Sequence, residues 1–334
     1  MRPLAIVAII ALANLTPPQA FGADGGPLDG FKIKGTTYFD LFAPLTEEGP
    51  RTMGEISAFE FRRAYFTVEH TLNDEFAVRF RTDADRKADD KFRPFIKHLY
   101  MSWAGIVPNA KIYVGISGTP TWSSFAEKYW GYRGVDKTML DAFKGVTGTS
   151  IDVTSAAAGV ALKGTVADKL LGYHVFFSNG EGYSHPEEDK YKKLMFQGSV
   201  KPVDGAVLVG LVELEPQDSD NNNTLLKGFA GYKSGGAAVG AEYFVYTRGG
   251  VDNKSSGLSV FGRYDVQDNV TPFVRLDMYE PDSETDEDET SLVIAGIDFR
   301  PHSKVHVMPN VHYFINPGAA EADLIATLTF QYGL

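Results

Sequence analysis

The chain has 334 residues, no cysteine and a formal net charge of -11. The acidic total disfavours binding to nucleic acid, which needs a basic face, so we expect no nucleic-acid partner. Without cysteine there is no disulfide, so hydrogen-bond ladders and packing must hold the fold together.

Residues 1–22 have the pattern of a secretory signal peptide. Arg2 is positive, residues 4–15 form a short apolar stretch, and Ala20 and Gly22 are small residues before a cleavage position. The apolar stretch is too short for a helix that spans a membrane. We therefore expect an exported chain, and loss of Arg2 with the signal would bring the net charge from -11 to -12.

The mature sequence alternates between apolar and polar residues in sixteen segments that are separated by turn residues. Alternation of period two is typical of β-strands, whose successive side chains point to opposite faces. The predicted strands cover residues 31–42, 57–71, 74–84, 93–105, 110–118, 156–164, 169–179, 191–202, 205–215, 223–234, 236–248, 256–267, 269–280, 290–300, 303–315 and 321–334.

The connections between these segments alternate in length. One set is tight, for example 72–74, 202–205 and 234–236, whereas the other is generally longer and more polar, for example 179–190 and 280–289. Outer-membrane barrels have this arrangement, with short periplasmic turns and longer extracellular loops. Nothing in the fold of a soluble β-sandwich requires short and long loops to alternate along the chain.

The two faces of the predicted strands differ in chemistry. In 303–315, Val305, Val307 and Val311 alternate with His306 and His312. A barrel turns the apolar face to lipid and the polar face to a wet lumen. We predict an all-β fold, a transmembrane antiparallel β-barrel of about 16 strands over residues 23–334, in which the last strand closes against the first because no backbone group can stay unpaired in hydrocarbon.

The longest connection, 119–155, is predicted to fold into the bore and form a constriction, because a loop of this length needs a functional reason. Its aromatic residues could anchor it to the inner wall. The alternative is an extracellular lid that never enters the pore. The candidate constriction residues are Lys128, Arg133, Lys137, Lys144, Glu127, Asp136 and Asp141.

Alternation also predicts which charged side chains face the lumen. Rings of one charge sign set ion preference in pores, but mixed signs on neighbouring strands can instead form ion pairs that stiffen the wall. Both interpretations stay open here. A third combines them: a basic wall opposite an acidic wall would create an electric field across the lumen, in a pore that weakly favours cations. The lumen-lining candidates are Arg63, Arg79, Arg81, Arg263, Arg275, Arg300, Lys304, Asp265 and Asp277.

The sequence predicts neither a metal site nor a cofactor. His306 and His312 are six residues apart on one strand face, about 20 Å, so they cannot share a metal ion. No phosphate-binding loop and no nucleophile or zinc motif of a hydrolase occurs.

Four stretches carry a resemblance to a known family. FEFRRAYFTVEHTLNDEFAVRFRTDADRK, residues 59–87, resembles the second and third strands of the phosphate-selective porin O and P family. AKIYVGISGTPTWSSFAEKYWGYRGVDKTMLDAF, residues 110–143, resembles its strand that ends in a G-x-x-x-T-P turn and opens a long loop. VALKG at 160–164 and FFSNGEG at 176–182 resemble its following strands. The resemblance implies a sixteen-stranded, homotrimeric, water-filled channel whose anion-selective members line the bore with arginine and lysine.

The predicted function is that of a porin in the outer membrane of a diderm bacterium, a passive channel for ions and small hydrophilic solutes, with anions or phosphate suggested by the resemblance. Expected partners are membrane lipid and lipopolysaccharide, small ions and solutes, and two further copies in a homotrimer. The alternatives are a plugged barrel with a structural or adhesive role and, less favoured, an outer-membrane barrel hydrolase. We expect that the protein is not an enzyme, because the sequence shows neither a catalytic cluster around a nucleophile nor a pair of catalytic acids.

Overall fold

A computed structural model describes residues 30–46, 57–86, 91–123, 125–142, 151, 153–217, 221–250, 254–315 and 322–334. The predicted signal peptide, residues 1–22, lies outside these ranges. Within them, none of the helices has the length and apolar character needed to cross a membrane.

The described chain forms sixteen strands and three short helices. They are β1 (Phe31–Pro44), β2 (Ala58–Thr71), β3 (Phe76–Arg86), β4 (Phe92–Ala104), β5 (Ala110–Gly118), α1 (Pro120–Ser123), α2 (Ala126–Trp130), α3 (Met139–Ala142), β6 (Ala156–Val166), β7 (Leu171–Asn179), β8 (Lys192–Val200), β9 (Ala206–Pro216), β10 (Asn222–Ser234), β11 (Ala237–Thr247), β12 (Lys254–Tyr264), β13 (Val270–Glu280), β14 (Thr290–His302), β15 (Val305–Ile315) and β16 (Asp323–Gly333). All sixteen predicted strands are present, with ends shifted by at most three residues.

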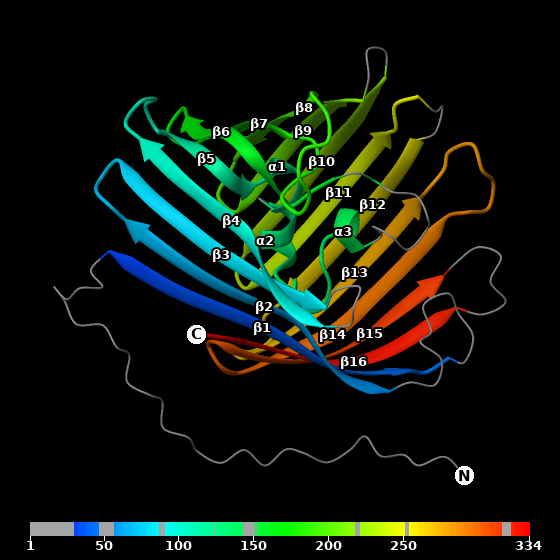
Figure 1. The fold of residues 1–334 in the computed structure, drawn as a ribbon. Coiled ribbons are helices and arrows are strands. Elements are labelled where there is room, and N and C mark those ends of the chain that lie inside the picture. The colour runs from blue at the N-terminus through cyan, green and yellow to red at the C-terminus, as the bar shows by residue number, and fades with distance from the viewer. Residues whose placement is uncertain are drawn as a thin grey trace, which may run out of the picture.

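The strands pair in chain order, all antiparallel, into one closed barrel (Figure 1). Closure occurs between β1 and β16, where Phe39 lies opposite Phe330 and Leu41 opposite Leu328. The predicted all-β, sixteen-stranded barrel is therefore confirmed. Connections of two to five residues alternate with connections of five to 37 residues, so all the short turns lie at one end of the barrel.

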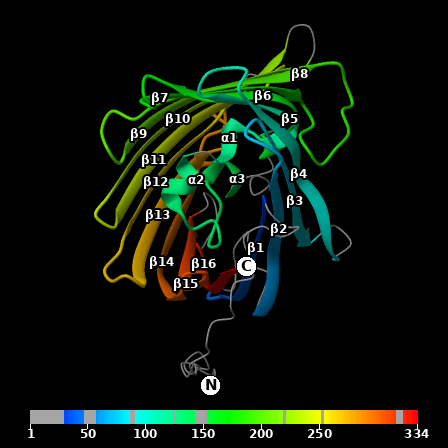
Figure 2. The ribbon, with the colours of Figure 1, turned by 90° about the vertical axis from the view of Figure 1, so that its left-hand side faces the viewer.

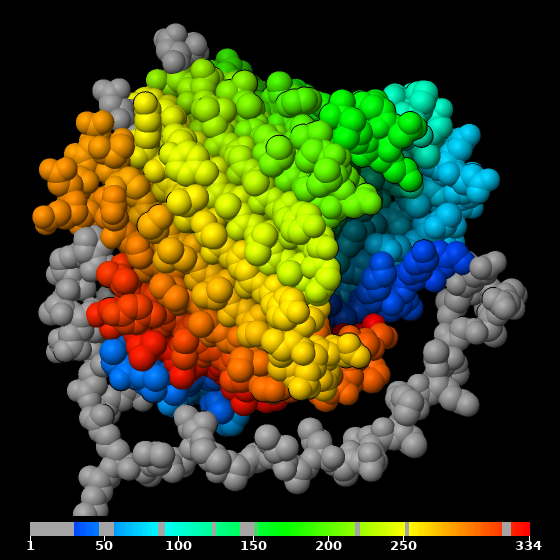
Figure 3. Space-filling model, turned by 180° about the vertical axis from the view of Figure 1, so that it is seen from behind, coloured from blue at the N-terminus to red at the C-terminus, as the bar shows by residue number. Residues whose placement is uncertain are grey.

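The two faces of each strand have opposite environments. On β13, Phe273, Arg275 and Asp277 are buried inside the barrel, whereas Val274 and Leu276 are exposed on its outer side. Figure 3 shows this outer side as a continuous surface of side chains from β9 to β15. An apolar outer surface with charged residues inside is the reverse of a soluble protein and suits a barrel surrounded by lipid.

Two β-bulges break the alternation, one on β2 and one on β4. The β1–β2 register shifts so that Arg62 has no partner residue, and the β3–β4 register shifts so that Lys97 has none. A bulge inserts one extra residue and re-aims its side chain. As a result Arg62 joins Arg63, and Lys97 joins His98, on the inner face.

The connection between β5 and β6 turns into the barrel (Figures 1 and 2). Its helix α1 lies against β7, β8 and β9, α2 against β10, β11 and β12, and α3 against β12. The loop therefore follows the inner wall of this part of the barrel and leaves most of the wall formed by β2 to β6 facing the open lumen.

Candidate channel lumen and constriction

Aromatic packing holds the loop against the inner wall. Trp130 is fully buried, and its ring lies 5.6 Å from Phe261, 5.7 Å from Phe273 and 5.4 Å from Tyr132. Tyr132 in turn stacks on Phe273 at 4.2 Å. Such contacts exclude water from between the loop and the strands, so this part of the wall has an apolar core instead of a wet surface.

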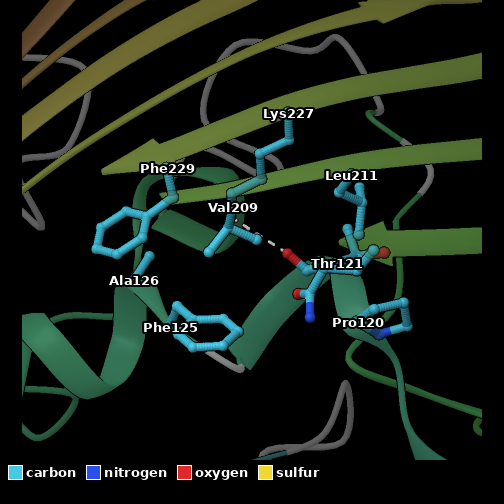
Figure 4. A pocket seen from close by; sticks show the side chains of 9 residues that line it. Pro120, Thr121, Phe125, Ala126, Val209, Leu211, Lys227 and Phe229 are labelled. Atoms are coloured by element: carbon cyan, nitrogen blue, oxygen red, sulfur yellow. Dashed lines mark hydrogen bonds between the residues drawn. The ribbon is translucent and has the colours of Figure 1, made fainter. Parts of the chain in front are cut away.

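Polar anchors fix the start of the loop. The Lys227 ammonium donates a hydrogen bond of 3.2 Å to the carbonyl oxygen of Thr121, drawn as a dashed line in Figure 4, and the Thr121 hydroxyl donates to Glu213. Thr121 and Lys227, with Pro120 and Phe229, line a cavity of only about 20 Å³. That volume holds about one water molecule. This cavity is therefore a joint between loop and wall and not a solute site.

A buried ion pair fixes the middle of the loop. The Arg275 guanidinium donates to Asp277 at 2.7 and 2.9 Å and to the Lys137 carbonyl oxygen at 2.5 Å. It also lies 3.6 Å from Asp136 and over the Trp130 ring at 5.1 Å. Because the loop covers them, Arg275 and Asp277 secure the loop instead of meeting water in the lumen.

The loop tip, residues 133–135, extends to β2. The Arg62 guanidinium donates to the carbonyl oxygen of Gly134 and pairs with Asp40 at 2.5 Å. Arg133 pairs with Glu127 at 2.7 Å within the loop and donates to the Tyr65 hydroxyl at 3.3 Å. The loop is therefore attached to both halves of the barrel, which narrows the lumen.

Four cations surround the Tyr65 ring where the tip meets β2. Arg63 and Arg133 donate to its hydroxyl, at 3.1 and 3.3 Å. Arg81 and Lys97 lie 5.3 and 5.6 Å from its ring centroid. Three carboxylates, Asp83, Asp85 and Glu127, pair with three of these four cations, so the wall of β2 to β4 keeps a small positive surplus beside the loop tip.

A larger cavity lies beside this wall, between β3–β7 and the loop. Its volume is about 280 Å³, and its lining includes Arg79 from β3, Lys163 from β6 and Lys128 from α2, with Tyr100 and Tyr113 between them. Among the described residues, no carboxylate lines it. We call it the basic cavity.

Inward-facing carboxylates and cations differ in pairing. Asp83 pairs with Lys97 at 3.1 Å and Glu242 with Lys227 at 2.6 Å, and Lys193 lies 3.1 Å from both Glu213 and Glu215. Five inward-facing cations, in contrast, have no carboxylate within 4 Å in the part of the chain that the structure describes. They are Arg81, Lys128, Lys163, Lys233 and Arg263.

Part of the acidic surplus of the sequence lies outside the lumen. Residues 280–289 contain seven carboxylates and connect β13 to β14 at the end of the barrel with the longer loops, where residues 283–287 are exposed. A second cavity, of about 330 Å³, opens near the same end, where Asp40, Glu60 and Asp136 share the lining with Arg62. The charge of the whole chain is therefore a poor guide to the charge of the pore.

The short-turn end of the barrel holds three more of the predicted residues. Arg300 pairs with Asp265 at 3.2 Å. The hydrogen bond from the Thr271 hydroxyl, and to a smaller extent Arg300, lowers the pKa of Asp265. Lys304 lies exposed in the turn between β14 and β15. These residues form a rim and not a constriction.

The remaining predicted residues divide between the open lumen and the loop. Arg63, Arg79 and Arg81 lie on the basic wall, and Arg263 lies 5.9 Å from the Tyr132 ring. On the loop, Lys128 is exposed to the basic cavity, whereas Glu127, Arg133, Asp136 and Lys137 are engaged in contacts. Lys144 and the side chain of Asp141 lie outside the described part of the chain.

Sequence reasoning missed Arg62, Lys97 and Lys163. The first two follow from the bulges, and the adjacent polar pairs in FRRA and IKHL are the signal, because strict alternation would send one member of each pair into lipid. Lys163 lies in a segment that is apolar on both faces, which hid its orientation.

No protein-family model matches the sequence, and no curated protein matches it either. Solved structures do show the same fold. An anion-selective porin from Comamonas acidovorans has a TM-score of 0.67 at 12% identity, over 91% of this chain and 99% of that one. The outer membrane channel DcaP of Acinetobacter baumannii has a TM-score of 0.65 at 12% identity, over 91% and 97%. The trimer form of OmpT from Vibrio cholerae has a TM-score of 0.63 at 13% identity, over 91% and 99%.

These likenesses confirm the porin fold, which is a fold of the bacterial outer membrane. They do not show membership of the phosphate-selective O and P family, which stays a prediction.

Proposed function

We propose that the protein is an outer-membrane porin, a passive channel for ions and small hydrophilic solutes that favours anions. A sixteen-stranded barrel encloses an aqueous channel that its side chains cannot fill. The loop of α1 to α3 narrows it from one side. Solutes would pass between the loop and the basic wall of β2 to β4, by diffusion and with no covalent step.

One observation carries the anion preference. Inward carboxylates such as Asp83 and Glu242 are paired with cations, whereas five inward cations have no carboxylate beside them in the described chain. Fixed charges of one sign at a constriction favour ions of the opposite sign, and they act more strongly there than in bulk water. The pore therefore carries an excess positive field although the chain is acidic.

The orientation and assembly follow the same proposal. Short turns face the periplasm in outer-membrane barrels, which places the acidic 280–289 loop outside the cell, among lipopolysaccharide. A homotrimer is supported by the trimer form of one similar structure. Phosphate is one anion that the basic wall could pass.

The test is conductance in a planar lipid bilayer. Purified protein should give discrete current steps, and a tenfold gradient of potassium chloride should give a reversal potential of the sign set by chloride. A barrel with a plugged lumen would carry no current. Current with a reversal potential of the sign set by potassium would contradict the anion preference while leaving the channel itself in place.

A further inference from the structure

We infer that the basic cavity is a binding site for small organic dianions, of which dicarboxylates are the simplest, and not only a charged stretch of the pore. This rests on the proposed function, because the solute must enter the lumen to reach it. The cavity holds about 280 Å³, close to the lower end of small-molecule sites. It is far larger than the loop-anchoring cavity at Thr121.

Four side chains that line this cavity carry a hydrogen-bonding atom without a partner in the described chain. Nδ1 of His98, Nδ1 of His174, Oγ of Ser117 and Nε of Arg79 are buried and have no hydrogen-bond partner among the described residues. Ser117 and His174 are 4% and 6% exposed. Buried polar groups are nearly always hydrogen-bonded, so four unpaired ones on the lining of one cavity show that this lining keeps unused capacity for polar partners.

The spacing of the cations favours a solute with two separated negative groups. Arg79 on β3 and Lys163 on β6 are three strand intervals apart and four residues out of register, which puts their backbones roughly 19 Å apart along the wall. Lys128 approaches from the loop on the other side. Two cations whose backbone positions are this far apart suit a solute with two separated negative groups better than one compact anion.

Aromatic rings separate the cations. Tyr100 and Tyr113 meet edge to face with centroids 5.4 Å apart, and His98 lies 6.2 Å from Tyr100. They offer apolar surface to a carbon body between two charged ends. Glu69 is the carboxylate that faces Arg79, at 3.5 Å from its Nη1, which leaves the Nε of that guanidinium unused.

The test is block of single-channel chloride current by a series of probes on the full-length protein. The probes are butyrate, inorganic phosphate, malonate, glutarate and pimelate. The longer dicarboxylates should block with dissociation constants at least tenfold below those of butyrate and phosphate. Lys163→Gln should weaken their block by about tenfold or more.

Arg263→Gln is the matched control, since it also removes one inward cation without a carboxylate partner but does not line the cavity. It should leave the order of the probes unchanged. Equal block by all probes, or equal loss in both variants, would overturn the inference even if the pore conducts anions. Absence of any current would instead refute the proposed channel.

Discussion

Substituting Trp130 tests whether the loop sets the size of the pore. Its ring is fully buried against Phe261 and Phe273, and its indole nitrogen donates to the Asp136 carbonyl oxygen at 3.0 Å. Truncating a buried tryptophan to alanine costs about 3–5 kcal/mol. The barrel ladder does not depend on this side chain, so we expect the cost to fall on docking of the loop.

A loss of that size corresponds to a fall in the ratio of docked to undocked loop of roughly two to three and a half orders of magnitude. Trp130→Ala should therefore show larger or noisier single-channel conductance and admit larger neutral polymers. Trp103→Ala is the control, because Trp103 lies on the outer face of β4, 37% exposed beside Phe76. An unchanged conductance and exclusion size in folded Trp130→Ala would refute the role of the loop as the constriction.

Three further predictions concern stability. Asp277→Ala leaves the Arg275 guanidinium buried without its main partner and should lower the free energy of unfolding, measured in urea, by about 3–5 kcal/mol. Replacing Arg275 with methionine and Asp277 with leucine together should lower it much less. Equal losses in the two variants would contradict this. Leu276→Arg, in the middle of the outer face of β13, should destabilise the barrel by about 2–4 kcal/mol when folding into lipid vesicles is measured, and no loss would mean that this face does not meet lipid. The Thr271 hydroxyl and a neighbouring guanidinium lower the folded-state pKa of Asp265, so the stability that this carboxylate contributes is complete above its unfolded pKa, near 3.9, and is lost as pH falls through the lowered folded value. Urea titrations should show Asp265→Asn less stable than the natural protein at neutral pH and equally stable at low pH. A stability difference that does not depend on pH would argue against this coupling.

The strands could be predicted because their constraint is local. A strand in lipid must alternate and must be long enough to cross, and both properties are visible in the sequence itself. The closing strand shows this well: Leu328 and Phe330 face out and Thr329 is buried inside, as alternation requires. Strand ends shifted by at most three residues because turns leave less regular patterns.

The site was harder to predict because its constraints are long-range. Strict alternation assumes an unbroken register, and the bulge at Arg62 breaks it. Alternation also says that Arg275 points inward but not that a loop from elsewhere in the chain covers it. Aromatic residues in the loop suggested an anchor, yet their partners, Phe261 and Phe273, could be identified only from the folded barrel.

The total charge misled for a related reason. A sum over the sequence gives the 280–289 carboxylates the same weight as lumen residues, although exposed charges more than about 10 Å from the pore are largely screened at 0.1 M salt. Position relative to the constriction decides which charges an ion meets.

The most direct test measures reversal potentials, in a salt gradient above 0.1 M, for the natural protein and two neutralised variants. One variant replaces Arg81, Lys128 and Lys163 with glutamine, and the other replaces the seven carboxylates of 280–289 with amides. The natural pore should favour chloride, the lumen variant should lose most of that preference, and the loop variant should retain it. A loop variant that changes selectivity while the lumen variant does not would contradict the account.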